Sequence, residues 1–435
     1  MLKFTKVKII SICLLVPLII LIWPIYDSLV HKNKISFLPF YQFDELPKTS
    51  PTDQILYQER YEQAANKALD LITAHKVVIN APAISAAVAI DGKLVWAGAS
   101  GWADIENETP VTTNTQFRIG STSKALTATG LARIFDDNKI DLDKKISFYM
   151  KNLPNDNWEN ITSRQLVSHM AGLPHYKQNN DYLGLYKTIT LSNRYEQVED
   201  SLAIFDSSDL LFEPGSQFNY STLGTVLLSA VMESAVNTPY LEFMKKQVFD
   251  PLKMNATMAE FQGENAKNLA KFYWNNSGSS NQVREWRNVD LSHRLAGGGY
   301  ISTSSDLVKM GSAFLDNKFV SAKTRKIFWT PQTLPDGSET PNGYSLGWRV
   351  LTRNIDPEVG EITFANHGGV SRGAQSWLMV IPKHNISVAV NINSNTKVFW
   401  DFGKVSMEVL RPFLLAKISM DQKVLITQSN TLLGN

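Results

Sequence analysis

Segments with the pattern of β-strands lie near the two ends of this sequence, and the long stretch between them has the pattern of helices. The first such region, 83–104, contains the turn-forming pair Asp91-Gly92 between two runs of β-prone residues, which predicts a hairpin. Four further strand-like segments follow one another near the C-terminus: 345–354, 361–369, 374–382 and 386–393. Strands at both ends with helices between them predict one antiparallel sheet built from the two terminal regions. We therefore expect an α/β (α+β) fold, with helices flanking the sheet and an inserted, mainly helical domain at about 120–290.

Helices are predicted where apolar residues recur at helical spacing. The clearest cases in the middle section are 123–138, 162–170 and 223–235. A further amphipathic helix is expected over 52–75, beginning at Thr52-Asp53, and a closing helix over 402–418.

These patterns predict four regions along the chain. They are an N-terminal membrane anchor (1–31), a linker (32–52), the main domain (53–418) and a C-terminal tail without regular structure (419–435).

The N-terminal region has the composition of a targeting segment. Lys3, Lys6 and Lys8 precede a run without charged side chains, 9–26, which is close to the roughly 20 residues that span a bilayer. No pair of small residues marks a cleavage site after this run. We predict an uncleaved, single-pass signal-anchor with its N-terminus inside, so that the main domain is exported to the periplasm or cell exterior. A removed signal peptide is the alternative.

Composition excludes several classes of function. The net charge is only +2 and no basic block occurs, so nucleic acid is not an expected partner. Cys13 is the only cysteine, which excludes an intramolecular disulfide and a cysteine-based zinc site. No histidines and carboxylates stand at ligand spacing, so neither a metal nor another cofactor is expected. The sequence does not predict an oligomeric state.

A serine stands three residues before a lysine at Ser121 and Lys124, directly before the helical pattern of 123–138. The serine could simply cap that helix. Alternatively, the two side chains share one face of a helix, so that the amine could take the hydroxyl proton. The spacing alone is not specific, because Ser394 and Lys397 repeat it in a polar loop.

The longer pattern around Ser121 resembles the serine β-lactamase-related family, which includes class C β-lactamases, D-amino-acid peptidases and related esterases. The resemblance covers roughly 80–400. The similar segments, in chain order, are GWADIENETPVTTNTQFRIGSTSKALTATGLARI, ITSRQLVSHMAGLPHY, FEPGSQFNYSTLGTVLLSAVMESA, DPLKMNAT, AGGGYISTSSDLVKMGSAFL, YSLGWRV and NHGGVSRGAQS.

The resemblance implies a β-lactamase/transpeptidase-like fold and a set of site residues. Ser121 would be the nucleophile, Lys124 its base, and Tyr220 the tyrosine of the family's Tyr-x-Asn motif. His367, Gly368 and Gly369 would form the strand motif, and the backbone amides of Ser121 and Val370 would hold the oxyanion.

The sequence departs from the family pattern at two of these positions. Thr222 replaces the usual asparagine after Tyr220, and a threonine lacks the two N–H groups of an amide. A literal Tyr-x-Asn occurs at 273–275, but it lacks the family's flanking residues. His367 stands where a lysine is common and offers less fixed charge for a substrate carboxylate. These features are similar to the branch of the mitochondrial serine β-lactamase-like protein, which implies a peptidase rather than a strong β-lactamase.

We therefore predict a membrane-anchored serine acyl-hydrolase that acts through an acyl-enzyme on peptides, cell-wall-derived D-peptides or esters. His367 would help to fix the far end of the substrate. The alternative is a catalytically weak member of the family that binds a peptide or forms a scaffold at the membrane, and Thr222 is the feature that favours it.

Overall fold

The computed structural model describes residues 2–32, 34–35, 41–191, 193–263, 266–275, 281–356 and 359–433. Its α-helices are α1 (Leu2–His31), α2 (Glu62–Val78), α3 (Ser123–Asp136), α4 (Ser163–Val167), α5 (Tyr182–Thr190), α6 (Thr222–Val236), α7 (Tyr240–Met244), α8 (Glu260–Gly263), α9 (Leu295–Gly298), α10 (Ser304–Ala313), α11 (Ala322–Phe328) and α12 (Phe399–Leu433). Its strands are β1 (Asp44–Glu45), β2 (Thr52–Leu56), β3 (Ala83–Ile90), β4 (Lys93–Asp104), β5 (Thr109–Pro110), β6 (Phe117–Arg118), β7 (Met258–Ala259), β8 (Tyr273–Trp274), β9 (Gln282–Glu285), β10 (Tyr300–Ser302), β11 (Arg349–Asp356), β12 (Gly360–Ser371), β13 (Ala374–Ile381) and β14 (Ile386–Ile392).

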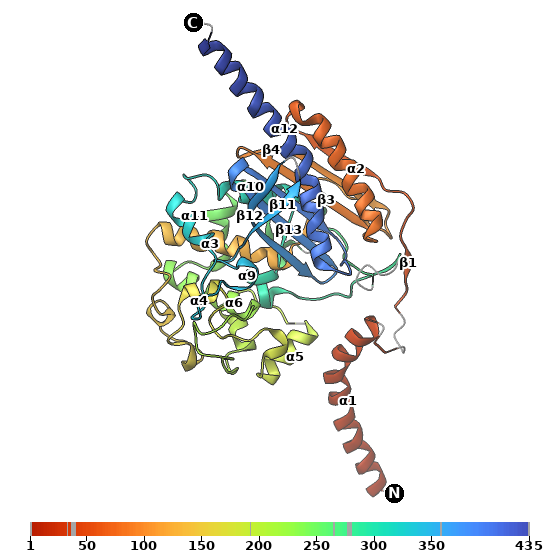
Figure 1. Cartoon of the computed structure of the whole chain (residues 1–435). Coiled ribbons are helices and arrows are strands. Elements are labelled where there is room, and N and C mark those ends of the chain that lie inside the picture. Colours follow the sequence, from red (N-terminus) through yellow and green to blue (C-terminus); the bar gives the residue numbers. More distant parts are fainter. Residues whose placement is uncertain are drawn as a thin grey trace.

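One large sheet is built from the two terminal regions, as the sequence predicted. Its strands run in the order β11-β12-β13-β14-β3-β4-β2, with antiparallel pairing throughout, and β5 pairs with β4. The N-terminal and C-terminal parts meet where β14 pairs with β3, with Ala389 opposite Ala87. The mainly helical segment that contains α3 to α9 lies beside this sheet (Figure 1). This arrangement confirms the predicted mixed fold.

The predicted hairpin joins β3 and β4. Asp91 has a φ of 52° and Gly92 a φ of 74°, so both central residues of the turn are left-handed. Two left-handed residues are what the tight turn of a twisted hairpin requires, and Asp-Gly is among the pairs that adopt this conformation most readily.

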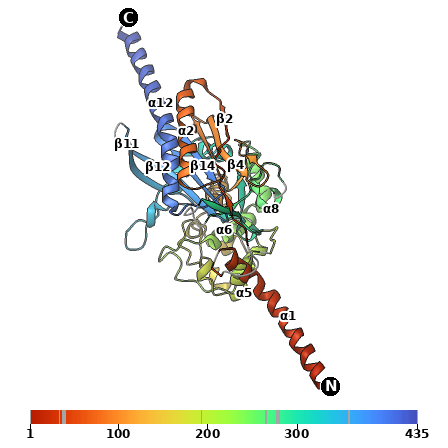
Figure 2. The same cartoon turned by 90° about the vertical axis from the view of Figure 1, so that its right-hand side faces the viewer.

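The central strands are buried on both faces, and their side chains divide between two hydrophobic clusters. In β3, Ile84 and Val88 point into a cluster formed with α2 and α12, whereas Ala87 and Ala89 point into the cluster on the opposite face. This alternation follows from the two-residue period of a strand. Figure 2 shows α2 and α12 together along one side of the sheet.

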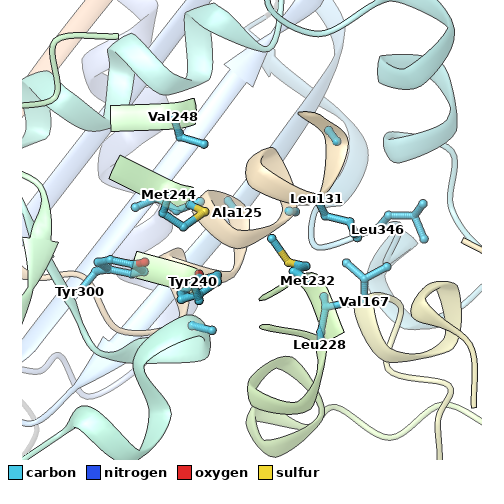
Figure 3. Close-up of a cluster of buried hydrophobic side chains, with 14 of the residues drawn as sticks. Ala125, Leu131, Val167, Leu228, Met232, Tyr240, Met244, Val248, Tyr300 and Leu346 are labelled. Atoms are coloured by element: carbon cyan, nitrogen blue, oxygen red, sulfur yellow. The ribbon is translucent and has the colours of Figure 1, made fainter. Parts of the chain in front are cut away.

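The second cluster packs around α3, the helix that follows the Ser-x-x-Lys pair. Figure 3 shows Leu131 of α3 near Met232 of α6 and Val167 of α4, within one group of buried side chains. All three side chains are almost completely buried. The helix α3 is therefore held in place by a packed core that it shares with α4, α6 and one face of the sheet.

The helix predicted over 52–75 is wrong in its first part. Thr52–Leu56 forms the edge strand β2, which pairs with β4, and α2 begins only at Glu62. The indole nitrogen of Trp96 in β4 also donates a hydrogen bond to the Oε1 atom of Gln54, at 3.1 Å. Pairing with the otherwise open edge of β4 thus overrides the local helical pattern.

At the C-terminus, α12 continues to Leu433, through residues that were expected to form an irregular tail (419–435). The sequence contains neither glycine nor proline between 413 and 433, so no residue interrupts the helix there.

The N-terminal helix α1 extends away from the body of the protein in both views (Figures 1 and 2). Most of its large apolar side chains between Leu15 and Trp23 are about half exposed. Among the described residues, no helix is both long enough and apolar enough to cross a membrane. The predicted membrane span at 9–26 is therefore not supported by this structure.

Candidate active site

Ser121 lies in a short 3₁₀ turn, Gly120–Thr122, directly before α3. No side chain forms a capping hydrogen bond at the start of this turn or of the helix, so Ser121 does not act as a helix cap. Its Oγ atom instead lies 3.3 Å from the Nζ atom of Lys124. The structure thus brings the two predicted residues into contact.

Lys124 is buried, with only 2% of its surface exposed. Its Nζ atom also lies 2.9 Å from the Oγ1 atom of Thr222 and 2.8 Å from the carbonyl oxygen of Gly297. Burial, reinforced by the positive charges of Arg294 and Arg349, holds the pKa of Lys124 well below its ordinary value of 10.5. This environment favours the uncharged amine over the ammonium, compared with an exposed lysine.

Tyr220 borders both of these residues. The Nζ atom of Lys124 lies 4.9 Å from the centre of the Tyr220 ring. The Tyr220 phenol also forms a hydrogen bond with the Ser121 side chain. Burial raises the pKa of Tyr220, although Arg349 and the Ser121 hydroxyl act in the opposite direction. The phenol therefore keeps its proton at neutral pH and can donate it.

The strand β12 passes directly against the loop that carries Ser121. A Cβ atom on Gly369 would lie only 1.9 Å from the carbonyl oxygen of Ile119 and 2.8 Å from the backbone nitrogen of Ser121. On Gly120 it would lie 2.5 Å from the carbonyl oxygen of Val370. Glycine is needed at both positions because the two backbones approach so closely. Gly368 is likewise close-packed, since a Cβ atom there would lie 2.5 Å from the rings of both Trp377 and Phe399.

His367 does not face the surface, because none of its side chain is exposed. Its ring belongs to a series of hydrogen bonds that also includes the side chains of His169 and Tyr344. The backbone N–H of Ser221 donates to Nδ1 of His169 (3.3 Å), and Nε2 of His169 donates to the Tyr344 hydroxyl (2.9 Å). That hydroxyl donates to Nε2 of His367 (3.2 Å), whose Nδ1 donates to the carbonyl of Gly368 (2.9 Å). This direction of donation satisfies every atom with both imidazoles neutral.

The electrostatics agree with that assignment. Burial lowers the pKa of His169 and of His367 well below the ordinary value, and nearby positive charges add to the effect. His367 therefore supplies no positive charge to the site, and its ring supports the site from behind Tyr220, at 6.5 Å between ring centres.

Two arginines, Arg349 and Arg294, also border the site, and neither was predicted from the sequence. The Arg349 guanidinium lies 5.6 Å from the ring centre of Tyr220 and 5.2 Å from that of Tyr344. Arg294 donates a 2.9 Å hydrogen bond to the hydroxyl of Ser371, the last residue of β12. Arg349 falls inside the segment YSLGWRV, whereas Arg294 lies two residues before AGGGYISTSSDLVKMGSAFL, so position within a family-like block was an available signal for Arg349 alone.

The structure places the other Tyr-x-Asn motif and the other Ser-x-x-Lys motif away from Ser121. The Tyr273 hydroxyl accepts a hydrogen bond from the backbone of Ile105, at 2.8 Å, rather than approaching Lys124. Ser394 lies after β14 and outside any helix, and no hydrogen bond joins it to Lys397 in the described part of the chain. Within that same part, no group of histidine, cysteine and carboxylate side chains could hold a metal ion.

The fold and these residues define a class of hydrolases related to the serine β-lactamases. The chain belongs to the Beta-lactamase family, whose model matches residues 70–403. It is 29% identical, over 411 residues, to the human serine beta-lactamase-like protein LACTB, mitochondrial, covering 76% of this chain and 74% of that protein. These matches confirm the resemblance seen in the sequence.

Two solved structures show the same fold. A class C beta-lactamase superimposes with a TM-score of 0.65 at 19% identity, covering 82% of this chain and 98% of that one. A D-amino acid amidase from Ochrobactrum anthropi superimposes with a TM-score of 0.64 at 22% identity, covering 83% and 99%.

Proposed function

We propose that the protein is a serine acyl-hydrolase that works through an acyl-enzyme on Ser121, with Lys124 as the base. The observation that carries this proposal is the buried amine 3.3 Å from the serine hydroxyl, with a pKa held well below its ordinary value. A serine hydroxyl is a weak nucleophile until a neighbouring base takes its proton, and only an uncharged lysine can do so.

The contacts of Lys124 orient its lone pair. A neutral amine has two N–H groups, and Thr222 and Gly297 provide two acceptors at 2.9 and 2.8 Å. When both N–H groups donate to these acceptors, the lone pair remains for the O–H of Ser121. Thr222 can therefore take over the orienting role of the family's asparagine, since one hydroxyl acceptor is sufficient for it.

In the proposed reaction, Lys124 takes the proton of Ser121 as Oγ bonds to the substrate carbonyl carbon. The backbone N–H groups of Ser121 and Val370 stabilise the oxyanion. Tyr220 gives its phenolic proton to the leaving group and regains one from the Lys124 ammonium, so the serine proton finally resides on the leaving group. A water molecule then releases the acyl group by the same steps in reverse.

Peptides and esters are the proposed substrates, ahead of β-lactams. His367 is buried and uncharged, so it contributes no fixed charge for the carboxylate that penicillin-like molecules carry. One of the solved structures with the same fold is a D-amino acid amidase. An amide or ester with a D-configured acyl group is therefore a suitable first substrate to assay.

Covalent labelling tests the proposal. The full chain is incubated with a fluorophosphonate or a penicillin, and the mass of the intact protein is measured. We expect one adduct on the wild-type chain, none on Ser121→Ala, and an undiminished adduct on Ser394→Ala, which alters the other Ser-x-x-Lys pair. Equal labelling of Ser121→Ala and the wild type would refute the mechanism. A folded wild-type chain that no probe labels would instead favour a peptide-binding or scaffold role.

Membrane attachment through the apolar surface of α1 is a further part of the proposal. The exposed apolar side chains between Leu15 and Trp23 support it, because such a contiguous apolar surface is unfavourable in water. Replacing Leu18, Ile19 and Ile20 by glutamine should move the full chain from the membrane fraction to the soluble fraction. An unchanged distribution would contradict attachment by this segment.

A further inference from the structure

A cavity of about 500 Å³ lies between the end of α1, the helix α5 and the turn that follows β12. Four of its lining residues carry positive charge: Lys32, Lys177, Arg287 and Arg372. They come from segments far apart in the sequence, and α1 contributes one side of the wall through Ser28 and the residue that follows its end.

Positive charge in this cavity exceeds negative charge. Arg287 lies 3.8 Å from the carboxylate of Asp27, which also accepts a hydrogen bond from Tyr41. No carboxylate in the described part of the chain pairs with Lys32, Lys177 or Arg372.

The cations of this cavity act on one another. Burial, together with the positive charges of Arg372, Arg287 and Lys177, lowers the pKa of Lys32 to about 8. Burial likewise lowers the pKa of Arg372 to about 10. Like charges gathered in a partly enclosed space are unfavourable on their own, and an anion relieves the repulsion between them.

The cavity adjoins the candidate active site. Arg372 follows Val370 by two residues, and the backbone of Val370 touches Gly120, next to the nucleophile. On the other side, His175 lines the cavity and accepts a 3.2 Å hydrogen bond from the backbone of Thr222. The cavity wall therefore includes residues that lie next to Val370 and Thr222 of the candidate active site.

The rest of the lining is largely apolar, with Leu185, Ile189 and Trp286 beside the charged groups. We propose that this cavity is a substrate subsite for an apolar acyl chain that ends in an anion, a carboxylate or a phosphate, and that Lys32, directly after α1, completes the subsite. The inference rests on the proposed function, because it assigns the ligand to the acyl part of a substrate of Ser121.

Ligand binding to the Ser121→Ala chain, which cannot hydrolyse the ligand, tests this subsite separately from catalysis. Monomethyl suberate carries an ester carbonyl at one end and a carboxylate at the other, and dimethyl suberate is its uncharged match. Their Kd values are measured by calorimetry on the full-length Ser121→Ala chain. A phosphate-ended methyl ester of the same length distinguishes the two possible anions.

We expect at least one of the two anionic ligands to bind at least about tenfold more tightly than the diester, since charge-assisted hydrogen bonds to arginine are the strong ones. Adding Arg372→Gln or Lys32→Gln should reduce this preference, whereas adding Arg353→Gln, an exposed arginine on β11, should preserve it. Equal Kd values for all three ligands would overturn the subsite even if Ser121 labels normally. If the ligands showed the anion preference but the covalent probes failed to label Ser121 in the wild-type chain, the proposed function would be overturned instead.

Discussion

Replacing Lys124 by methionine should reveal the charge of the buried amine through the pH dependence of stability. In the folded chain, burial and the charges of Arg294 and Arg349 lower the pKa of Lys124 well below 10.5, the ordinary value that the unfolded chain retains. Between these two pKa values the unfolded chain binds a proton that the folded chain does not. The free energy of unfolding of the wild type therefore rises with pH in this window.

The size of this effect follows from the linkage between protons and folding. One bound proton changes the free energy of unfolding by about 1.4 kcal/mol per pH unit. Methionine has a similar length and no proton to release. The difference between the wild type and Lys124→Met should thus grow by about 1.4 kcal/mol for each pH unit between the two pKa values. The lost hydrogen bonds to Thr222 and Gly297 shift this difference by a constant amount and leave its slope unchanged.

The assay is urea unfolding of the full chain, followed by tryptophan fluorescence at several pH values. An exposed lysine provides the control, Lys139→Met, which accounts for the loss of one surface charge. If the difference between wild type and Lys124→Met stayed flat across this range, the amine would be charged in the folded chain and the reasoning would be refuted.

Three further substitutions test the surroundings of the site. Arg349→Gln removes a positive charge that lowers the pKa of Lys124, so the acid limb of kcat/KM against pH should move to higher pH. Tyr344→Phe leaves two buried imidazole nitrogens without their partner and should lower the free energy of unfolding by about 2–4 kcal/mol, measured in urea. Gly369→Ala places a methyl group 1.9 Å from the carbonyl oxygen of Ile119 and should slow probe labelling about 100-fold.

Each of these expectations has a contrary result. An acid limb that does not move in Arg349→Gln would show that this charge does not act on the base. A loss below about 1 kcal/mol in Tyr344→Phe would contradict the hydrogen-bonded chain. Gly224→Ala is the control for the glycine change, since its Cβ would meet other atoms only at 3.6 Å or beyond. Labelling of Gly369→Ala at the rate of this control would contradict the close approach of β12.

The parts of the fold that the sequence predicted are those with strong local patterns. The runs of β-prone residues and the Asp91-Gly92 turn predicted the sheet, because β-propensity and a left-handed turn are properties of the local chain. The strand at Thr52–Leu56 was missed because an edge strand depends on the partner that it meets, here β4.

The same distinction applies to the site. Ser121 and Lys124 could be paired from the sequence because they are one helical turn apart. The approach of Arg349 to Tyr220 depends on how β11 joins the sheet, and no local pattern contains that information. Likewise, the sequence could not show that the ring of His367 points into a buried hydrogen-bonded chain rather than toward a substrate.

Nuclear magnetic resonance of isotopically labelled lysine tests the central claim most directly, because the shifts next to Nζ differ between an amine and an ammonium. The resonance of Lys124 is assigned by its absence from Lys124→Met, and its titration is compared with the rate at which Ser121 is acylated. We predict an uncharged amine at neutral pH that gains a proton only in the acidic range where acylation fails. An ammonium group that persists across the pH range in which Ser121 is acylated would contradict the account.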